Sequence, residues 1–415
     1  MMAETAKNKL LILGAGKFQF HLIEKAREMG NYVIVISPDG DYPGLLIADK
    51  VYYHDATDKE YVLDTARKEQ VNGIISDQAE IFVGAIAYAT DILGLPGNSY
   101  ESALIYTNKH KMRQRTKEIG LPTIKNVLVP ELSEAKSFYK NSGCDVIIKP
   151  VDSFSSRGVY KICCEEDLDH YFEKAKAYSP SDKVIVEQFI EGRLFEVDSI
   201  AVNGEIETLM YADLDEFNIP NVFSSRTRLY PSDADPALIK RLLEFDKKVN
   251  QGFGLVQGLT HNEYIVDSKT DEIYLIEAAL RGGGSYIGSH IAILQTGLDT
   301  AEFLVKIALG QISELPQFEK NRCNCGYVTF YLPEGEIVSR DGADEVDALP
   351  YVVKTTLADI RVGNTTSGIA DKEQRHIIVL YADTRDALLA RIDYIKDMLK
   401  ISIRTSQGIE KPIWN

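Results

Sequence analysis

The sequence predicts a mixed α/β and α+β protein with several domains, and three observations support this prediction. From Lys9 onward an apolar strand, a glycine turn and an amphipathic helix follow one another, which is typical of a βαβ unit that opens a parallel sheet. The middle of the chain instead contains short strands separated by loops rich in glycine and serine, as in α+β domains. The length of 415 residues corresponds to about two or three domains at roughly 150 residues each.

The first region is expected to span residues 1–107 and to be Rossmann-like. Its first strands are predicted at Leu10–Leu13 and Tyr32–Ile36, with the turn Gly14-Ala15-Gly16 between them. A dinucleotide-binding turn carries a third glycine that lets the helix pack close to the strand, but Lys17-Phe18-Gln19 occupies that region here. We therefore expect the turn to be structural or to serve a ligand other than NAD or FAD.

The second region is expected to span residues 108–315, and a third, small α+β region follows at residues 316–415. Helices are predicted at Asn108–Ile119, Asp235–Asn250 and Arg385–Leu399, and strands at Val146–Pro150, Val184–Glu187 and Glu196–Val202. The pair Asp235-Pro236 supports the start of the long helix, because aspartate caps helix N-termini and proline is favoured at the first helical position.

The composition argues against several classes of partner. The chain has 62 acidic and 46 basic residues and a formal net charge of −16, so it lacks the basic surface that attracts nucleic acids and anionic membranes. Its longest uncharged stretch, Ile81–Thr90, is too short to cross a bilayer. The N-terminus does not resemble a signal peptide, so a cytoplasmic location is expected. The five cysteines show no C-x-x-C spacing and are expected to be reduced.

The most informative residues are two glutamates in a predicted hairpin. The segments His261–Asp267 and Glu272–Glu277 are apolar strands joined by a polar turn centred near Thr270. In a symmetric register Glu263 faces Glu277, and the next facing pairs are 265 with 275 and 267 with 273. Like charges that face each other in buried strands are destabilising, so a cation is expected between them, and Mg²⁺ suits carboxylate oxygens. The alternative is two solvated carboxylates at a sheet edge.

Basic residues and small-residue loops accompany this pair. Arg281 follows Glu277 by four residues and precedes a run of three glycines, which suits an anionic group shared between a metal ion and a guanidinium. Lys149 ends a predicted buried strand just before the loop 152–158, whose amides and hydroxyls suit phosphate oxygens. Lys109 opens the first helix of the second region and, on its own, looks like a surface lysine.

In their order along the chain, these elements resemble the ATP-grasp superfamily, in particular its carboxylate-amine ligase branch, over about residues 9 to 400. The similar elements are Asn108-Lys109, Ile148-Lys149-Pro150 with its loop, Val186–Gly192, His261-Asn262-Glu263, and Ile276-Glu277 followed by Arg281. The first region is similar to the superfamily's purine-biosynthesis carboxylases in the stretch from Asp39 to Asp49. The resemblance implies an ATP-grasp domain at 108–315 with a lid at about 122–190, between a Rossmann-like domain and a small closing domain.

The resemblance implies ATP as a cofactor and assigns its binding to residues of this chain. Lys109 and Lys149 would hold the phosphates, and the loop residues expected to close over them are Ser153, Ser155, Ser156 and Gly158. The hinge that reads adenine is expected at Glu187, Gln188, Phe189 and Ile190. Within this hinge Glu187 would accept a hydrogen bond from the amino group.

The metal ions and the chemistry are likewise assigned by resemblance. Glu263 and Glu277 would hold one or two Mg²⁺ or Mn²⁺ ions. Arg281, together with Lys149, would stabilise the transferred phosphoryl group. Candidates for contact with the substrate are Arg226, Arg228, Ser285, Tyr286 and His290, for each of which a structural role is the alternative.

Two positions depart from the family pattern. Ala279 stands where many members have an asparagine two residues after the second metal glutamate. Leu194 stands where several members have a ribose-binding glutamate, and Glu191 or Glu196 could replace it. Both departures bear on how tightly ATP and a second metal ion are held.

The function implied by the resemblance is that of an ATP-dependent ligase. It would activate a small-molecule carboxylate as an acyl phosphate and join it to an amine, releasing ADP and phosphate. One alternative is an enzyme that uses bicarbonate, as purine carboxylases and carbamoyl-phosphate synthases do, and another is a regulatory ATP-binding protein without turnover. The first region favours bicarbonate, whereas Ala279 and the glycine-rich loop favour an amino-acid ligase. The resemblance is also compatible with a homodimer.

Overall fold

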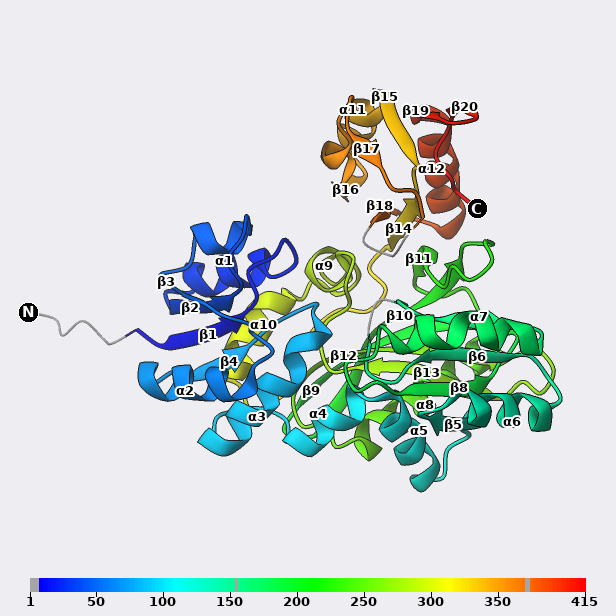
Figure 1. The fold of residues 1–415 in the computed structure, drawn as a ribbon. Coiled ribbons are helices and arrows are strands. Elements are labelled where there is room, and N and C mark those ends of the chain that lie inside the picture. The colour runs from blue at the N-terminus through cyan, green and yellow to red at the C-terminus, as the bar shows by residue number, and fades with distance from the viewer. Residues whose placement is uncertain (1–6, 154–155, 370–373) are drawn as a thin grey trace, which may run out of the picture.

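The computed structural model describes residues 7–153, 156–369 and 374–415. Within these ranges the strands form four sheets connected by helices and loops (Figure 1). This architecture confirms the predicted mixture of α/β and α+β structure. None of the helices in these ranges is long and apolar enough to cross a membrane.

The first sheet is parallel, as the βαβ pattern predicts. Its order is β3-β2-β1-β4, formed by β1 Lys9–Leu13, β2 Tyr32–Ser37, β3 Lys50–Tyr53 and β4 Gly73–Ile75. The accompanying helices are α1 Phe20–Glu28, α2 Lys59–Glu69, α3 Val83–Leu93 and α4 Tyr100–Tyr106. Leu10 and Ile12 enter one core, while Leu11 and Leu13 enter another on the opposite face. Burial on both faces explains why β1 is apolar from Leu10 to Leu13.

The largest sheet has eight strands in the order β13-β12-β9-β10-β11-β14-β18-β16. They are β9 Gly192–Val202, β10 Glu205–Glu216, β11 Ser225–Tyr230, β12 Gly258–Asp267, β13 Ile273–Ala279, β14 Asn324–Phe330, β16 Val352–Thr355 and β18 His376–Ala382. All neighbouring pairs in this sheet are antiparallel. Strand β9 begins at Gly192, four residues before the predicted start at Glu196.

The long helix α8, Pro236–Gly252, packs against one face of this sheet. The Asp235 carboxylate accepts from the Ala237 amide at 2.8 Å, which confirms the predicted N-cap. Phe195 and Val197 share a core with α8. Because side chains alternate along a strand, Glu196 and Asp198 point to the opposite face.

In sequence, the strands of a smaller sheet lie between those of the first sheet and those of the largest sheet. Its order is β5-β8-β6-β7, formed by β5 Asn126–Val129, β6 Val146–Pro150, β7 Tyr160–Ile162 and β8 Val184–Gln188. Helix α5, Lys109–Glu118, precedes it, and helices α6 Leu132–Ser142 and α7 Glu165–Lys176 pack on it through one hydrophobic core.

The last sheet has the order β17-β15-β19-β20, formed by β15 Gly335–Asp341, β17 Thr365–Thr366, β19 Lys400–Thr405 and β20 Gly408–Glu410. The remaining helices are α9 Ala292–Thr296, α10 Thr300–Ala308, α11 Ala343–Asp347 and α12 Arg385–Met398. Figure 1 shows this sheet with α11 and α12 apart from the first sheet, on the far side of the β14–β18 pair.

Candidate functional site

A cavity of about 430 Å³ lies between the β5–β8 sheet and the eight-stranded sheet, which both contribute to its wall. A volume of this order suits a small-molecule ligand. The wall contains these residues predicted to bind nucleotide or metal: Lys109, Lys149, Ser153, Ser156, Glu187, Gln188, Phe189, Ile190, Glu263 and Glu277. Gly158, which was also predicted to bind nucleotide, is not among the described wall residues, although its neighbours Arg157 and Val159 are. Ser155 lies outside the described residues.

The two glutamates of the hairpin are directly paired across the β12–β13 ladder, as predicted. A bulge between Glu263 and Tyr264 then shifts the register, so that Ile265 faces Tyr274 and Val266 faces Ile273. The predicted pairs 265 with 275 and 267 with 273 are therefore wrong. A bulge adds one residue to one strand, and the apolar pattern of this hairpin does not reveal it.

Each of the two glutamates has a basic partner. Lys109 Nζ lies 2.9 Å from Glu277 Oε1 and donates to the Ser153 carbonyl at 2.6 Å. Arg228 Nη2 lies 2.5 Å from Glu263 Oε1. These cations offset the repulsion between the facing carboxylates. Two carboxylates in the wall of a cavity are also the hard oxygen donors that Mg²⁺ prefers, so the residues fit the metal ion that the resemblance implies.

Lys149 belongs to a buried ion-pair network. Its Nζ lies 2.6 Å from Glu187 Oε2, while Arg113 Nε donates to Glu187 Oε1 at 2.8 Å. Burial alone would raise the pKa of Glu187, but the charges of Arg113 and Lys149 outweigh it and lower that pKa to about 2. Burial lowers the pKa of Lys149, and the charge of Glu187 opposes this shift. The network holds Lys149 at the cavity wall.

Polar groups of the predicted adenine-binding hinge already form hydrogen bonds and ion pairs within the protein. Both carboxylate oxygens of Glu187 accept from basic side chains, so a bond to an adenine amino group would have to replace one of these ion pairs. The amides of Gln188 and Phe189 donate to the Lys125 and Asp145 carbonyls, both at 2.9 Å. The network shows why a buried strand carries a glutamate, which the strand pattern alone does not explain.

Arg281 lies outside the described cavity wall and contacts the first region instead. Its Nη2 is 3.2 Å from Glu80 Oε2, and the Gly282 amide donates to Asp77 Oδ1 at 3.2 Å. Burial raises the pKa of Glu80 to about 7, although the charge of Arg281 acts in the opposite direction. Sequence reasoning missed Asp77 and Glu80. The signal for them was their position after β4, because ligands of parallel sheets bind beyond the carboxyl ends of the strands.

Among the predicted substrate residues, Arg228 is the one that the described cavity wall includes. Arg226 instead donates to Asn415 Oδ1 near the C-terminus, at 2.9 Å. The structure thus separates two arginines that the sequence treats alike.

Of the other three substrate candidates, Tyr286 and His290 lie against Phe18 and His21 of the first region, whereas Ser285 Oγ accepts from Arg375 Nη2 of the third region at 3.3 Å. The ring of Tyr286 packs edge-on against Phe18, with centroids 5.6 Å apart. Burial, aided by the charge of Lys354, lowers the pKa of His290 to about 4. His290 is therefore neutral near pH 7.

The two positions that depart from the family pattern have different surroundings. Ala279 is buried and faces His261 across the β12–β13 ladder. Leu194 and Glu191 both line the cavity, whereas Glu196 is fully buried. Of the two predicted replacements for the ribose-binding glutamate, the structure thus brings Glu191 to the described cavity wall.

Comparisons with known proteins agree with this fold. Residues 142–289 match a family model described as ATP-grasp domain. Alanine–anticapsin ligase of Bacillus subtilis is 29% identical over 326 residues, which cover 71% of this chain and 67% of that protein.

Two solved structures show the same fold at low sequence identity. An L-amino acid ligase from Bacillus licheniformis has a TM-score of 0.83 at 20% identity, covering 97% of this chain and 100% of that one. The biotin carboxylase domain of a Hydrogenobacter thermophilus 2-oxoglutarate carboxylase, in complex with MgADP and bicarbonate, has a TM-score of 0.74 at 17% identity, covering 98% and 92%. Residues 142–289 are thus similar to the ATP-grasp domain, and the two solved structures share the fold over almost the whole chain.

Proposed function

We propose that this chain is an ATP-dependent ligase that activates a carboxylate as an acyl phosphate and joins it to an amine, releasing ADP and phosphate. The observation that carries the proposal is the facing pair Glu263 and Glu277 in a cavity wall that also contains Lys109 and Lys149. This set of charges suits a triphosphate with a divalent ion. The similarity to an alanine–anticapsin ligase and to an L-amino acid ligase supports a carboxylate and an amine as the two substrates.

The residues of the wall would act through charge rather than as nucleophiles. Glu263 and Glu277 would hold Mg²⁺, which supplies counter-charge to the transferred phosphoryl group. Lys109 and Lys149 now pair with Glu277 and Glu187, and each would turn toward phosphate oxygens. The bond between the β- and γ-phosphates would break as a carboxylate oxygen attacks in line. The amine would then attack the acyl carbon, and phosphate would leave.

Water must be kept from the acyl phosphate, which it would hydrolyse. The β5–β8 sheet forms one side of the cavity, and we propose that it is the lid expected at about residues 122–190. Its movement toward the eight-stranded sheet would close the cavity around the bound substrates.

The substrate end of the site is assigned to Arg281 and Glu80. Arg281 is fixed by Glu80 at one side and by the adjacent Gly282 carbonyl, at 3.0 Å, at the other. A guanidinium in this position would bind a carboxylate or an acyl phosphate once it leaves Glu80. This arrangement would place the carboxylate near the first region. We also propose a cytoplasmic location and a homodimer.

The proposal is tested by measuring ADP and phosphate from the full chain with Mg·ATP, in the presence of single amino acids, pairs of amino acids and small carboxylates. We expect at least one carboxylate and amine combination to raise ADP formation well above the rate with ATP alone. Equal amounts of ADP, phosphate and amide product are expected. Formation of AMP and pyrophosphate would contradict the proposal.

The same assay separates the alternatives. ADP formation that depends on added bicarbonate, in buffers freed of carbon dioxide, would support the bicarbonate-using enzyme. Binding of ATP without stimulation by any substrate would support the regulatory ATP-binding protein. A response to amino acids that is unchanged by removal of bicarbonate supports the ligase.

A further inference from the structure

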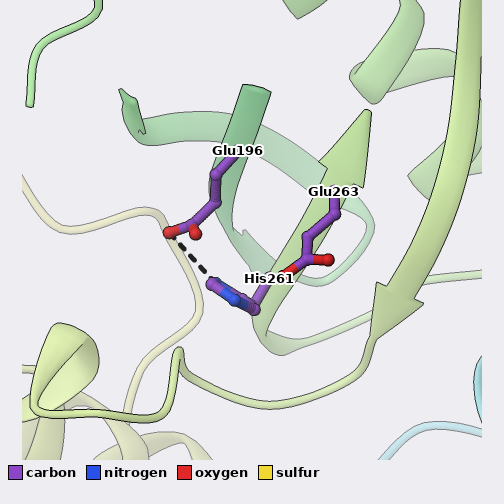
Figure 2. Close-up of side chains that lie close together, drawn as sticks. All are labelled: Glu196, His261 and Glu263. Atoms are coloured by element: carbon purple, nitrogen blue, oxygen red, sulfur yellow. Dashed lines mark ion pairs between the residues drawn. The ribbon is translucent and has the colours of Figure 1, made fainter. Parts of the chain in front are cut away.

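A buried group of charged side chains lies beside the Glu263–Glu277 pair, and most of it has no part in the proposed reaction. The β9–β12 register places Glu196 opposite Glu263 and Asp198 opposite His261. Side chains that face each other across a ladder share one face of the sheet, so this group shares the face that carries Glu277. Figure 2 shows Glu196, His261 and Glu263 converging from β9 and β12.

The ligand atoms of this group are close enough for a single ion. One atom from each of Glu196, His261 and Glu263 lies within 4.8 Å of the other two. Glu196 is 0% and His261 6% exposed, so bulk water competes little for these ligands. Two carboxylates with an imidazole suit Mn²⁺, Co²⁺ or Zn²⁺, whereas Mg²⁺ favours oxygen ligands alone.

The orientation of His261 is the second observation. Its Nδ1 lies 2.9 Å from Asp198 Oδ1 and 3.3 Å from Glu196 Oε1, and its Nε2 lies 2.9 Å from Arg228 Nη1. A guanidinium only donates hydrogen bonds, so Nε2 must be the acceptor and the ring proton must sit on Nδ1, where it is donated to Asp198. The Nε2 lone pair is therefore directed at the position that the Arg228 guanidinium occupies. In metal-binding histidines, the ring nitrogen that does not bind the metal typically donates a hydrogen bond to a carboxylate.

Arg228 places a positive charge where an ion would bind. Its guanidinium pairs with both Glu196 and Glu263 and contacts His261. Two carboxylates, from Glu196 and Glu263, pair with this single guanidinium, so the group favours further positive charge. Arg228 also lines the cavity, which gives its side chain a place to turn if an ion displaces it.

From this geometry we infer a second divalent-cation site, formed by Glu196, His261 and Glu263, for an ion of the Mn²⁺, Co²⁺ or Zn²⁺ class. Asp198 orients the imidazole, and Arg228 competes with the ion for the same ligands. The ion would displace Arg228 toward the nucleotide cavity. The site goes beyond the proposed function, because it needs neither a nucleotide nor turnover.

The experiment adds Mn²⁺ alone to the full chain, without nucleotide, and follows it by electron paramagnetic resonance. We expect a tightly bound Mn²⁺ that excess Mg²⁺ does not displace, with spin-echo modulation from a directly bound imidazole nitrogen. His261→Gln is expected to abolish the nitrogen signal and to weaken Mn²⁺ binding by about tenfold or more. Arg228→Gln is expected to strengthen binding, because it removes the competing cation. His170→Gln, which changes an exposed histidine outside the group, is the matched control and should behave as wild type.

Mn²⁺ bound without nitrogen coupling in the wild-type chain would locate the ion at the carboxylates alone and overturn the inference. Retention of the nitrogen signal in a folded His261→Gln variant would also overturn it, as would weaker binding in Arg228→Gln. If His261→Gln does not fold, the nitrogen coupling of the wild-type chain and the Mn²⁺ affinity of Arg228→Gln still test the inference. The ligase proposal is judged separately, by ADP formation.

Discussion

Replacing Glu277 by glutamine is expected to lower substrate-dependent ADP formation by about 10³-fold or more while leaving the fold intact. Glutamine keeps the shape of the side chain but removes one of the two facing charges that would hold the metal ion. It also removes the ionic partner of Lys109, which lies 2.9 Å away. Glu277 is only partly buried, and the buried Lys109 keeps the Ser153 carbonyl as an acceptor, so the fold is expected to tolerate the change.

The measurement is the initial rate of ADP formation at saturating Mg·ATP, with circular dichroism and thermal unfolding as checks of the fold. Glu272→Gln is the matched control, because Glu272 lies just before the same strand and is exposed. Turnover in Glu277→Gln at the wild-type rate would remove Glu277 from the site.

Replacing Glu187 by glutamine is expected to lower the free energy of unfolding by about 3–5 kcal/mol, measured by urea denaturation at pH 7.5. Glu187 is 1% exposed and compensates the buried charges of Arg113 and Lys149, so its loss leaves two buried cations with a neutral partner. Breaking a buried ion pair from one side costs more than removing the whole pair.

The pH dependence of this loss follows from the pKa of Glu187, which is lowered to about 2 in the folded chain. A carboxylate with a depressed pKa contributes stability above its unfolded pKa of about 4.3, and the contribution disappears as the pH falls toward the folded value. The difference between wild type and Glu187→Gln should therefore be full at pH 7.5 and shrink below about pH 4. Glu191→Gln, an exposed change on the cavity wall, serves as the control. Equal urea midpoints for wild type and Glu187→Gln at pH 7.5 would contradict the assigned network.

The fold was predictable where the signal is local. The βαβ pattern, the Asp235 cap and the apolar hairpin strands each depend on a short stretch of sequence. At these places the structure has a parallel sheet, a capped helix and an antiparallel strand pair. The facing of Glu263 and Glu277 follows from the same local pattern. The bulge after Glu263 does not, because one extra residue leaves no mark in an apolar run.

The partners of the site residues depend on contacts between distant segments. Arg113 and Glu187 are 74 residues apart, and Glu80 and Arg281 are 201 apart. A helix face or strand pattern shows that a charge is present, but only the fold shows which charge compensates it. The same holds for Glu196 and Asp198, which become a group with His261 only through the β9–β12 register.

The central claim is that the cavity binds Mg·ATP through the facing glutamates, and equilibrium binding tests it most directly. Isothermal titration of the full chain with a non-hydrolysable ATP analogue should show one site per chain that requires Mg²⁺. The double variant Glu263→Gln/Glu277→Gln should lose this Mg²⁺-dependent binding while remaining folded. Wild-type protein that does not bind the analogue, or a double variant that binds it as tightly as wild type, would contradict the claim.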